Sequence, residues 1–184
     1  DEPFSNLDTG LRVAIRNEVR NILRETQTTT VFVTHDQEEA MFMGDILAVM
    51  SKGRIQQIGD PAELYHSPST RFVASFLGNT DFLHGIIVDS IVRTELGEIP
   101  APKESYPGRI DLVLRPQDLV LGEGPGEGTV EGSEFRGATC LHHIRLVSGD
   151  KVRVETPVYL RSKVGDEVKV GIGPHYRAVG FPSQ

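Results

Sequence analysis

The chain contains 184 residues, of which 38% are apolar, and its 26 acidic and 19 basic side chains leave a net charge of −7. This composition predicts one or two soluble domains, because no apolar stretch approaches the roughly 18 residues of a membrane helix, and the acidic start is unlike a signal peptide. The acidic excess, present in both halves, disfavours nucleic-acid binding. Cys140 is the single cysteine, which excludes an internal disulfide and favours a reducing compartment.

The first eight residues concentrate polar groups. Asp1 and Glu2 stand side by side, and Ser-Asn-Leu-Asp follows at residues 5–8. Adjacent carboxylates are costly to hold together unless a metal ion or a catalytic base uses them. This opening therefore looks like part of an active site.

Residues 9–25 carry apolar side chains at helical spacing, and Asp8 or Thr9 can cap the helix that this spacing predicts. We therefore expect an amphipathic helix with one buried face. The other face carries arginines at i, i+4 intervals, which we interpret as a solvated stripe without a function. These arginines are Arg12, Arg16, Arg20 and Arg24.

A short β-branched segment follows at residues 31–34 and predicts a buried parallel strand that ends at His35. Ligands of open α/β sheets bind at the carboxyl ends of strands, so His35 is a better site candidate than a histidine within a strand. A lone histidine is more often structural. The position of His35 alone leaves its role open.

Residues 36–80 predict three further helices and one β-hairpin, because capping residues, a proline at a first helical position and glycine stops alternate with apolar runs. The expected helices are 37–43, 61–65 and 70–77, and the expected hairpin strands are 46–50 and 54–58.

After residue 81 the sequence changes to short β-rich segments separated by glycine, proline and acidic turn signals, the pattern of a small barrel or sandwich. The glycine-rich tract 122–128 lacks a lysine and a following helix, so we interpret it as a flexible turn rather than a phosphate cradle. His142 and His143 are adjacent on a strand and point to opposite faces, which disfavours a shared metal ion. The expected strands are 83–92, 109–114, 118–121, 128–135, 139–146, 151–156 and 167–171.

Taken together and in this order, these segments resemble the ATP-binding subunit of ABC-type importers. Residues 1–3 resemble the end of the Walker B strand, residues 5–8 the D-loop, and residues 34–40 the switch-histidine segment. Two further stretches resemble the tail of the nucleotide-binding domain in the sugar, polyamine, ferric iron and sulfate branch, and two more resemble landmarks of its TOBE domain. These stretches are 53–61 and 72–79, and then 114–118 and 135–137.

The resemblance covers essentially the whole chain and implies its fold. Residues 1–80 would be an α/β C-terminal remnant of a P-loop nucleotide-binding domain. Residues 81–184 would be an all-β TOBE domain, a barrel like the oligonucleotide-binding fold. The sequence contains no phosphate loop, Q-loop or Leu-Ser-Gly-Gly-Gln signature. We therefore expect a C-terminal fragment whose phosphate-gripping half precedes Asp1, and strands near the start that lack their neighbours.

The resemblance also implies residue roles. In the full-length protein Glu2 would be the general base and His35 would contact the γ-phosphate of ATP. Asp1 would hold Mg²⁺ through a water molecule. Ser5 and Asp8 would contact the bound nucleotide across a head-to-tail dimer. The subunit would thus be an ATP hydrolase that uses ATP and Mg²⁺. The fragment alone is expected to be inactive and to bind neither.

The implied partners are a second copy of the chain, held through residues 81–184, the transmembrane permease subunits, and indirectly a solute-binding protein. The implied location is the cytoplasmic face of the cell membrane, and we favour ferric iron or a polyamine as the solute. An alternative is a regulatory or dimerisation module whose β-barrel senses a small solute or an oxyanion, which the fold would permit.

Overall fold

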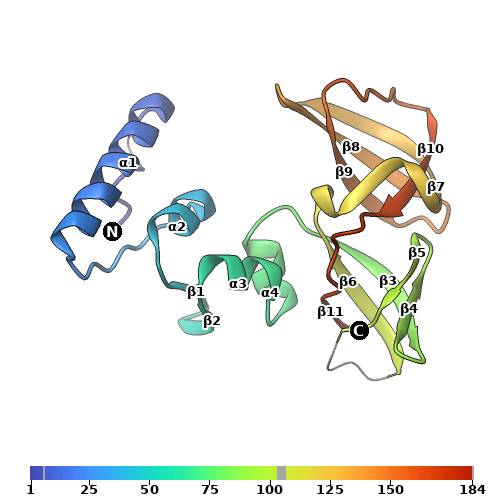
Figure 1. The fold of residues 1–184 in the computed structure, drawn as a ribbon, viewed down its shortest axis with the longest axis horizontal. Coiled ribbons are helices and arrows are strands. Elements are labelled where there is room, and N and C mark those ends of the chain that lie inside the picture. The colour runs from blue at the N-terminus through green and yellow to red at the C-terminus, as the bar shows by residue number, and fades with distance from the viewer. Residues whose placement is uncertain (6, 103–106, 184) are drawn as a thin grey trace. The chain divides into compact units, whose positions relative to one another are not determined.

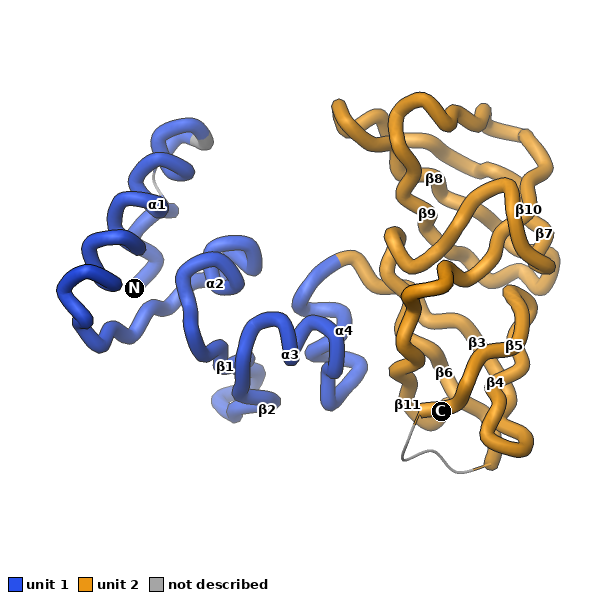
Figure 2. The backbone as a smooth tube through the Cα atoms, viewed as in Figure 1, with its two compact units in different colours: residues 1–78 blue, residues 79–184 orange. Residues whose placement is uncertain are grey.

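A computed structural model of the chain describes residues 1–5, 7–102 and 107–183. The chain divides into two compact units, residues 1–78 and residues 79–184, drawn in different colours in Figure 2. Each unit has its own cluster of buried apolar side chains. Within the part of the chain that the structure describes, no helix has both the length and the apolar character needed to cross a membrane.

Unit 1 consists of helices and a single hairpin in its described residues (Figure 1). Each helix begins after a side chain that accepts a hydrogen bond from a backbone N–H of its first turn, the capping role of Asp and Thr. The predicted helices and hairpin are confirmed. Their bounds are α1 Thr9–Thr26, α2 Gln37–Met43, β1 Leu47–Ser51, β2 Arg54–Gly59, α3 Pro61–His66 and α4 Arg71–Phe76.

The core of unit 1 is small and lies between the hairpin and the last two helices. Leu64 of α3, Val73 of α4 and Leu77 are almost completely buried against Val49 of β1. Pro61 at the start of α3 has a fixed φ suited to a first helical turn and lacks the N–H that would have no partner there. The hairpin, α3 and α4 thereby form one packed corner.

The predicted strand at residues 31–34 is not formed. This segment is extended, but among the described residues its backbone makes one hydrogen bond, in which the N–H of Glu2 donates to the carbonyl oxygen of Val33. The side chain of Val31 is 90% exposed. A buried parallel strand needs neighbours on both edges and both faces, and no strand lies beside this segment among the described residues.

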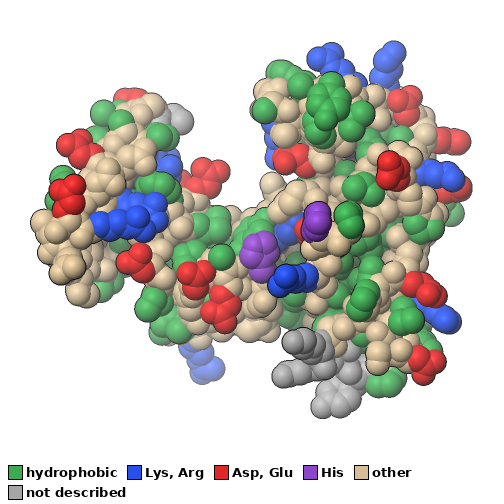
Figure 3. Space-filling view, viewed as in Figure 1, with side chains coloured by type: hydrophobic (Ala, Val, Ile, Leu, Met, Phe, Trp, Pro, Cys, Tyr) green, Lys and Arg blue, Asp and Glu red, His purple; other side chains and the backbone are tan. Residues whose placement is uncertain are grey.

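The prediction of a solvated arginine stripe on α1 is wrong for most of its length. The guanidinium groups of Arg16 and Arg20 lie 5.4 and 4.6 Å from the ring centroid of Phe42 in α2, the geometry of cation–π contacts. Arg24 remains largely exposed. Figure 3 shows basic side chains gathered on this side of unit 1. Conversely, Leu11 and Ile22, on the face expected to be buried, are half exposed.

Unit 2 is built almost entirely of antiparallel strands, as the sequence predicted for this part of the chain. The described strands form a four-stranded sheet, ordered β10-β7-β8-β9, and a five-stranded sheet, ordered β11-β6-β3-β4-β5. The bounds are β3 Asp81–Val88, β4 Ile91–Thr94, β5 Gly97–Pro100, β6 Gly108–Leu114, the 3₁₀ helix η1 Pro116–Asp118, β7 Leu119–Phe135, β8 Thr139–Leu146, β9 Lys151–Pro157, β10 Glu167–Ile172 and β11 Gly180–Pro182.

The two sheets share one apolar core. Alternating inward positions of β8 and β9 in one sheet, such as Ile144 and Val152, pack with Leu83 of β3 and Leu114 of β6 in the other. Such period-2 alternation is what a sheet with one solvated face requires. The strands are paired as two sheets rather than as one closed barrel, which refines the expected architecture.

Two sequence predictions in unit 2 fail at turns. The expected strand 83–92 is divided by a two-residue turn at Asp89 and Ser90, which both have positive φ, as a tight hairpin turn requires. The tract 122–128 is not a flexible turn but part of β7. The residues of this tract form a bulge where the pairing register with β10 shifts between Lys169 and Val170, and they pack on β10. The short strands β5 and β11 were not predicted.

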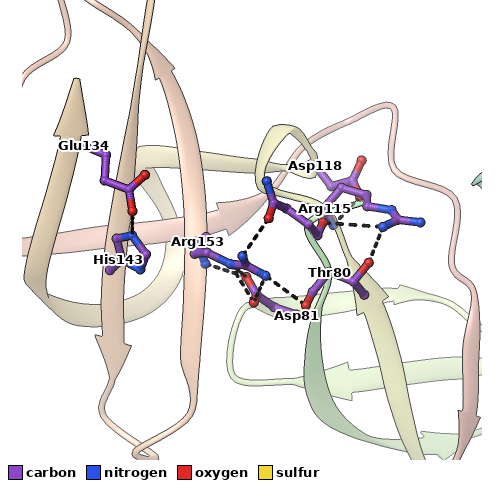
Figure 4. Close-up of polar contacts among 8 residues, drawn as sticks. Thr80, Asp81, Arg115, Asp118, Glu134, His143 and Arg153 are labelled. Atoms are coloured by element: carbon purple, nitrogen blue, oxygen red, sulfur yellow. Dashed lines mark hydrogen bonds and ion pairs between the residues drawn. The ribbon is translucent and has the colours of Figure 1, made fainter. Parts of the chain in front are cut away.

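A cluster of polar contacts fixes the start of unit 2 (Figure 4). The guanidinium of Arg153 donates to Asp81 at 2.8 and 3.0 Å, to the side-chain oxygen of Asn79 at 3.1 Å and to the carbonyl oxygen of Thr80 at 3.0 Å. The backbone N–H of Arg153 also donates to Asp81, at 2.7 Å. Arg115, which is buried, contacts the hydroxyl of Thr80. This cluster, the Arg153 clamp, holds residues 79–81 against β9.

We expect Gly124→Ala to destabilise unit 2 by about 3 kcal/mol or more, combining strain at its φ of +108° with overpacking. A Cβ at Gly124 would lie 2.7 Å from the nitrogen of Gly171 and from the carbonyl oxygen of Val170. Gly122→Ala is the matched control, since Gly122 also has a positive φ but open space around it, and should cost about 1 kcal/mol. Urea unfolding followed through the amide signals of β6 measures the free energy of unfolding of both variants. Equal decreases would contradict the packing of residues 122–128 on β10.

Arg153→Ala should lower the free energy of unfolding of unit 2 by about 2 to 3 kcal/mol, between the values for exposed and buried ion pairs. The side chains of Arg153 and Asp81 are only 24% and 14% exposed. Arg93→Ala is the control: Arg93 pairs with Glu98 at 2.9 Å, but both side chains are more than half exposed, so about 0.5 kcal/mol is expected. Similar losses for the two variants would show that the clamp does not anchor residues 79–81.

Candidate active site

The opening residues lie along the extended segment that ends at His35. The N–H of Glu2 donates to the carbonyl oxygen of Val33 at 2.7 Å. Phe4 is buried, and its ring centroid lies 5.6 Å from that of Phe32. One backbone bond and one aromatic contact therefore hold two segments together that are some thirty residues apart in sequence.

This arrangement brings Glu2 and His35 into direct contact. Oε1 of Glu2 and Nδ1 of His35 are 2.7 Å apart, while the two side chains remain 45% and 75% exposed. The pair is thus formed, yet open to a ligand or a water molecule. Glu2 also has a φ of +44°, a region that non-glycine residues rarely adopt and that occurs more often at functional sites.

The contact with Glu2 raises the pKa of His35 above its ordinary value of 6.5. The hydrogen bond to the Glu2 carboxylate is the main cause, followed by the negative charge of Glu2, with smaller contributions from Asp36 and Glu39 that act against partial desolvation of the ring. Because the folded pKa lies above the unfolded one, the pair stabilises unit 1 fully below about pH 6.5. That contribution is lost as the pH rises through the raised pKa.

The other predicted site residues lie around this pair. Asp1 is exposed next to Glu2, the hydroxyl of Ser5 donates to the carbonyl oxygen of Glu2 at 3.0 Å, and Asp8 caps α1 by accepting from the N–H of Leu11. Asn6, within the stretch that resembles a D-loop, lies outside the described residues. The structure therefore brings Glu2, Ser5 and His35 together and gives Asp8 a capping role.

The described residues of this site provide only some of the oxygen ligands that a hard cation such as Mg²⁺ needs. A carboxylate such as that of Asp1 is the kind of ligand that Mg²⁺ takes together with water and substrate phosphates. In the described residues, no group of three or more Asp, Glu, His or Cys side chains is placed to hold a metal ion by itself. Asp1 thus fits one protein ligand of an ion that a polyphosphate would complete.

Sequence reasoning missed a large cavity beside the pair. Its volume is about 1070 Å³, and it opens between α1, the segment 27–34 and β1. Phe4 and Val31 are among its apolar lining residues. Val31, which the sequence predicts to lie in a buried strand, and Ile46 are largely exposed on it. Unmatched apolar surface of this size is typical of a site that another molecule or segment covers.

A second cavity, of about 350 Å³, lies on the four-stranded sheet of unit 2. Its polar residues are paired: Arg153 contacts Asp81, Lys151 lies 3.0 Å from Glu131, and the ring of His143 lies 2.7 Å from Glu134. Arg145 also contacts Glu131, and the two cations lower the pKa of that carboxyl. Every cation that lines this cavity in the described structure therefore already has a carboxylate partner, so the geometry does not favour the oxyanion-sensor alternative.

His142 and His143 point to opposite faces of β8, as predicted. His142 is fully buried, with Nε2 3.0 Å from the hydroxyl of Thr156, and burial lowers the pKa of its ring. His143 lies on the outer face next to Glu134 (Figure 4). The two rings do not share a site.

Sequence comparisons identify relatives. Residues 112–176 match the TOBE domain family. The chain is 42% identical over 98% of its length to the Fe(3+) ions import ATP-binding protein FbpC of Pseudomonas fluorescens, of which it covers 52%. It is 39% identical over 85% of its length to the spermidine/putrescine import ATP-binding protein PotA 1 of Pseudomonas aeruginosa, covering 46%, and 40% identical over 95% to the sn-glycerol-3-phosphate import ATP-binding protein UgpC of a Ruegeria species, covering 51%.

These matches identify a domain within unit 2 and the proteins to which the whole chain is related. Unit 2 contains a TOBE domain, which lies within its two packed sheets. Over most of its length the chain is homologous to proteins named as ATP-binding subunits of ABC-type importers, which confirms the predicted resemblance. The chain spans about half the length of the relatives that it matches.

Glu2→Gln should return the titration midpoint of His35 toward its ordinary value of 6.5, because an amide removes the charge and weakens the hydrogen bond that raise the pKa. NMR titration of the assigned His35 ring signals in the 184-residue chain measures this change. Glu38→Gln is the control, since Glu38 is exposed on α2 and does not contribute to the raised pKa. If His35 titrates at its ordinary value in the unsubstituted chain, the contact with Glu2 is not formed in solution.

Proposed function

We propose that this chain is the C-terminal portion of a subunit that hydrolyses ATP to drive an ABC-type solute importer. The observation that carries the proposal is the 2.7 Å contact between Glu2 and His35 at two segments that match the family's motifs. Family membership supports the reaction class, and the contact supports the roles of these two residues. Residues 1–80 would then be part of a P-loop nucleotide-binding domain, and residues 81–184 the TOBE-containing domain.

In this proposal Glu2 is the general base. Phosphoryl transfer to water requires an oriented nucleophile and compensation of negative charge, and the protein mainly positions these groups. The Glu2 carboxylate can accept a proton from a water molecule within hydrogen-bond distance, whereas an amide cannot. His35, with its raised pKa, supplies positive charge next to the base, where a γ-phosphate oxygen could accept a hydrogen bond.

ATP would be the substrate and Mg²⁺ its counter-ion, with Asp1 as a protein ligand. Mg²⁺ supplies charge neutralisation of the phosphates when it is bound. Ser5 and Asp8 would meet the nucleotide across a head-to-tail pair of subunits. The 184-residue chain lacks the backbone cradle that grips phosphates in P-loop proteins, and we therefore expect it to bind ATP negligibly by itself.

The proposed partners follow from the same assignment. Two copies of the subunit would pair, with residues 81–184 contributing to the contact, and would bind the transmembrane permease subunits on the cytoplasmic face of the membrane. A solute-binding protein would act through the permease. Among solutes we favour ferric iron or a polyamine, to which the names of two relatives refer; loss of uptake of one of these solutes on deletion of the gene tests this choice.

In the full-length subunit, Glu2→Gln should lower the rate of ATP hydrolysis by roughly 10²- to 10⁴-fold, the contribution typical of a general base, while ATP binding is retained. Steady-state hydrolysis and nucleotide binding by calorimetry measure the two effects. Calorimetry on the 184-residue chain should show no ATP binding.

Glu18→Gln provides the control for that experiment, because Glu18 is exposed on α1 and lies outside the site. It should hydrolyse ATP at the unsubstituted rate. An unchanged rate in Glu2→Gln would exclude Glu2 as the base, and tight ATP binding by the 184-residue chain would show that nucleotide affinity resides in this half.

A further inference from the structure

Arg12 connects the two segments that form the candidate site. It lies in the first part of α1, and its Nη2 donates to the carbonyl oxygen of Leu7 at 3.0 Å. On its other side, Nε lies 3.9 Å from Oε1 of Glu39 and Nη1 lies 3.8 Å from Oδ2 of Asp36. One guanidinium thus touches the loop that precedes α1 and the start of α2.

The α2 side of this contact surrounds His35. Glu39 is buried, and its second carboxylate oxygen accepts from the hydroxyl of Thr34 at 3.0 Å. That hydroxyl in turn accepts from the N–H of Asp36 at 3.0 Å, and the side chain of Asp36 caps α2 at Glu39. The residues on either side of His35 are therefore fixed by a carboxylate that faces Arg12.

A buried carboxylate needs a cation or several hydrogen bonds to stay charged at little cost. Thr34 provides one bond to Glu39, and Arg12 provides the positive charge. Without Arg12, the buried carboxylate of Glu39 would face no cation and would turn toward solvent, which would loosen Thr34 and Asp36. The backbone between them carries His35.

We propose that Arg12 is a positioning residue, which holds His35 against Glu2 through Glu39 and Thr34 and ties this geometry to the loop at residues 5–8. The inference rests on the proposed function for its catalytic consequence. Its geometric part concerns this chain alone. Nε of Arg12 is buried and makes no hydrogen bond, so a small shift of α1 toward α2 would convert the 3.9 Å ion pair into a hydrogen bond. The loop before α1 is thereby placed to adjust His35.

The rival interpretation is that Arg12 only contributes to packing between α1 and α2. Arg16 separates the two possibilities. It lies on the same face of the same helix and contacts α2 through the ring of Phe42. In the described structure it makes no polar contact with Thr34, Asp36 or Glu39. Both substitutions, Arg12→Ala and Arg16→Ala, weaken helix packing, and only the first removes the charge facing Glu39.

The first test uses NMR titration of His35 in the 184-residue chain. Arg12→Ala should lower the midpoint of His35 toward that measured in Glu2→Gln. Thr34→Val, which removes the hydroxyl between Glu39 and Asp36 without changing a charge, should do the same with Arg12 intact. Arg12→Lys should restore part of the shift, because a lysine keeps the charge but not the planar fork. Arg16→Ala should leave the midpoint unchanged. Equal effects of Arg12→Ala and Arg16→Ala, or no effect of either, would overturn the inference.

The second test uses the full-length subunit. Arg12→Ala should lower kcat for ATP hydrolysis roughly 10- to 100-fold, as misplacement of a catalytic group by about 1 Å does, with KM for ATP changed less than about 2-fold. Arg16→Ala should retain kcat. If Glu2→Gln leaves the rate of ATP hydrolysis unchanged, the proposed function is wrong whatever the titrations show. If Glu2→Gln abolishes hydrolysis while Arg12→Ala and Arg16→Ala have the same kcat, only the proposed role of Arg12 is wrong. Circular dichroism verifies folding, and Arg12→Lys and Thr34→Val decide the matter if Arg12→Ala unfolds.

Discussion

The candidate site depends on one contact between distant segments, the placement of residues 1–5 along the extended chain that ends at His35. A single backbone bond from Glu2 to Val33 and the packing of Phe4 on Phe32 maintain it. In a complete sheet such a contact would be one of many ladder bonds. These two interactions hold Glu2 next to His35, so a change that displaces Phe4 or the backbone at Val33 should also displace the Glu2–His35 pair.

The two units use charge in opposite ways. In unit 2, Arg153, Lys151 and His143 are each paired with a carboxylate, and in the Arg153 clamp six hydrogen bonds from Arg153 hold residues 79–81. Fully paired groups are stable but have little capacity to bind a ligand. In unit 1, Asp1, Glu2 and His35 stay exposed, and a non-glycine residue occupies left-handed backbone. The Glu2–His35 pair of unit 1, although formed, is therefore open to solvent, whereas Arg153 and Asp81 of unit 2 are largely enclosed.

The sequence predicted local structure well where local chemistry determines it. Helix starts followed from capping side chains such as Asp60 and Thr70, and most strands of unit 2 from apolar alternation. The strand at 31–34 failed because a parallel strand is made by its neighbours, and the turn at Asp89 and Ser90 lacks the glycine that marks most such turns. Glu2 and His35 were identified from the motifs in which they lie. Their contact could not be predicted, because a sequence motif does not give the distance between two side chains. Arg12 was missed because i, i+4 arginines are usually solvated.

The exposure of the Glu2–His35 pair has a mechanistic consequence. Two charges at 2.7 Å in a solvated position interact weakly, since water screens them, and a general base surrounded by bulk water has little advantage over the solvent itself. Electrostatic catalysis becomes strong when water is excluded and the dipoles are already oriented. The apolar cavity of about 1070 Å³ that adjoins Phe4 and Val31 offers the surface on which such a cover could pack. If the proposed function holds, the pair would supply oriented groups, and a surface packed on that cavity would supply the low dielectric that strengthens their action.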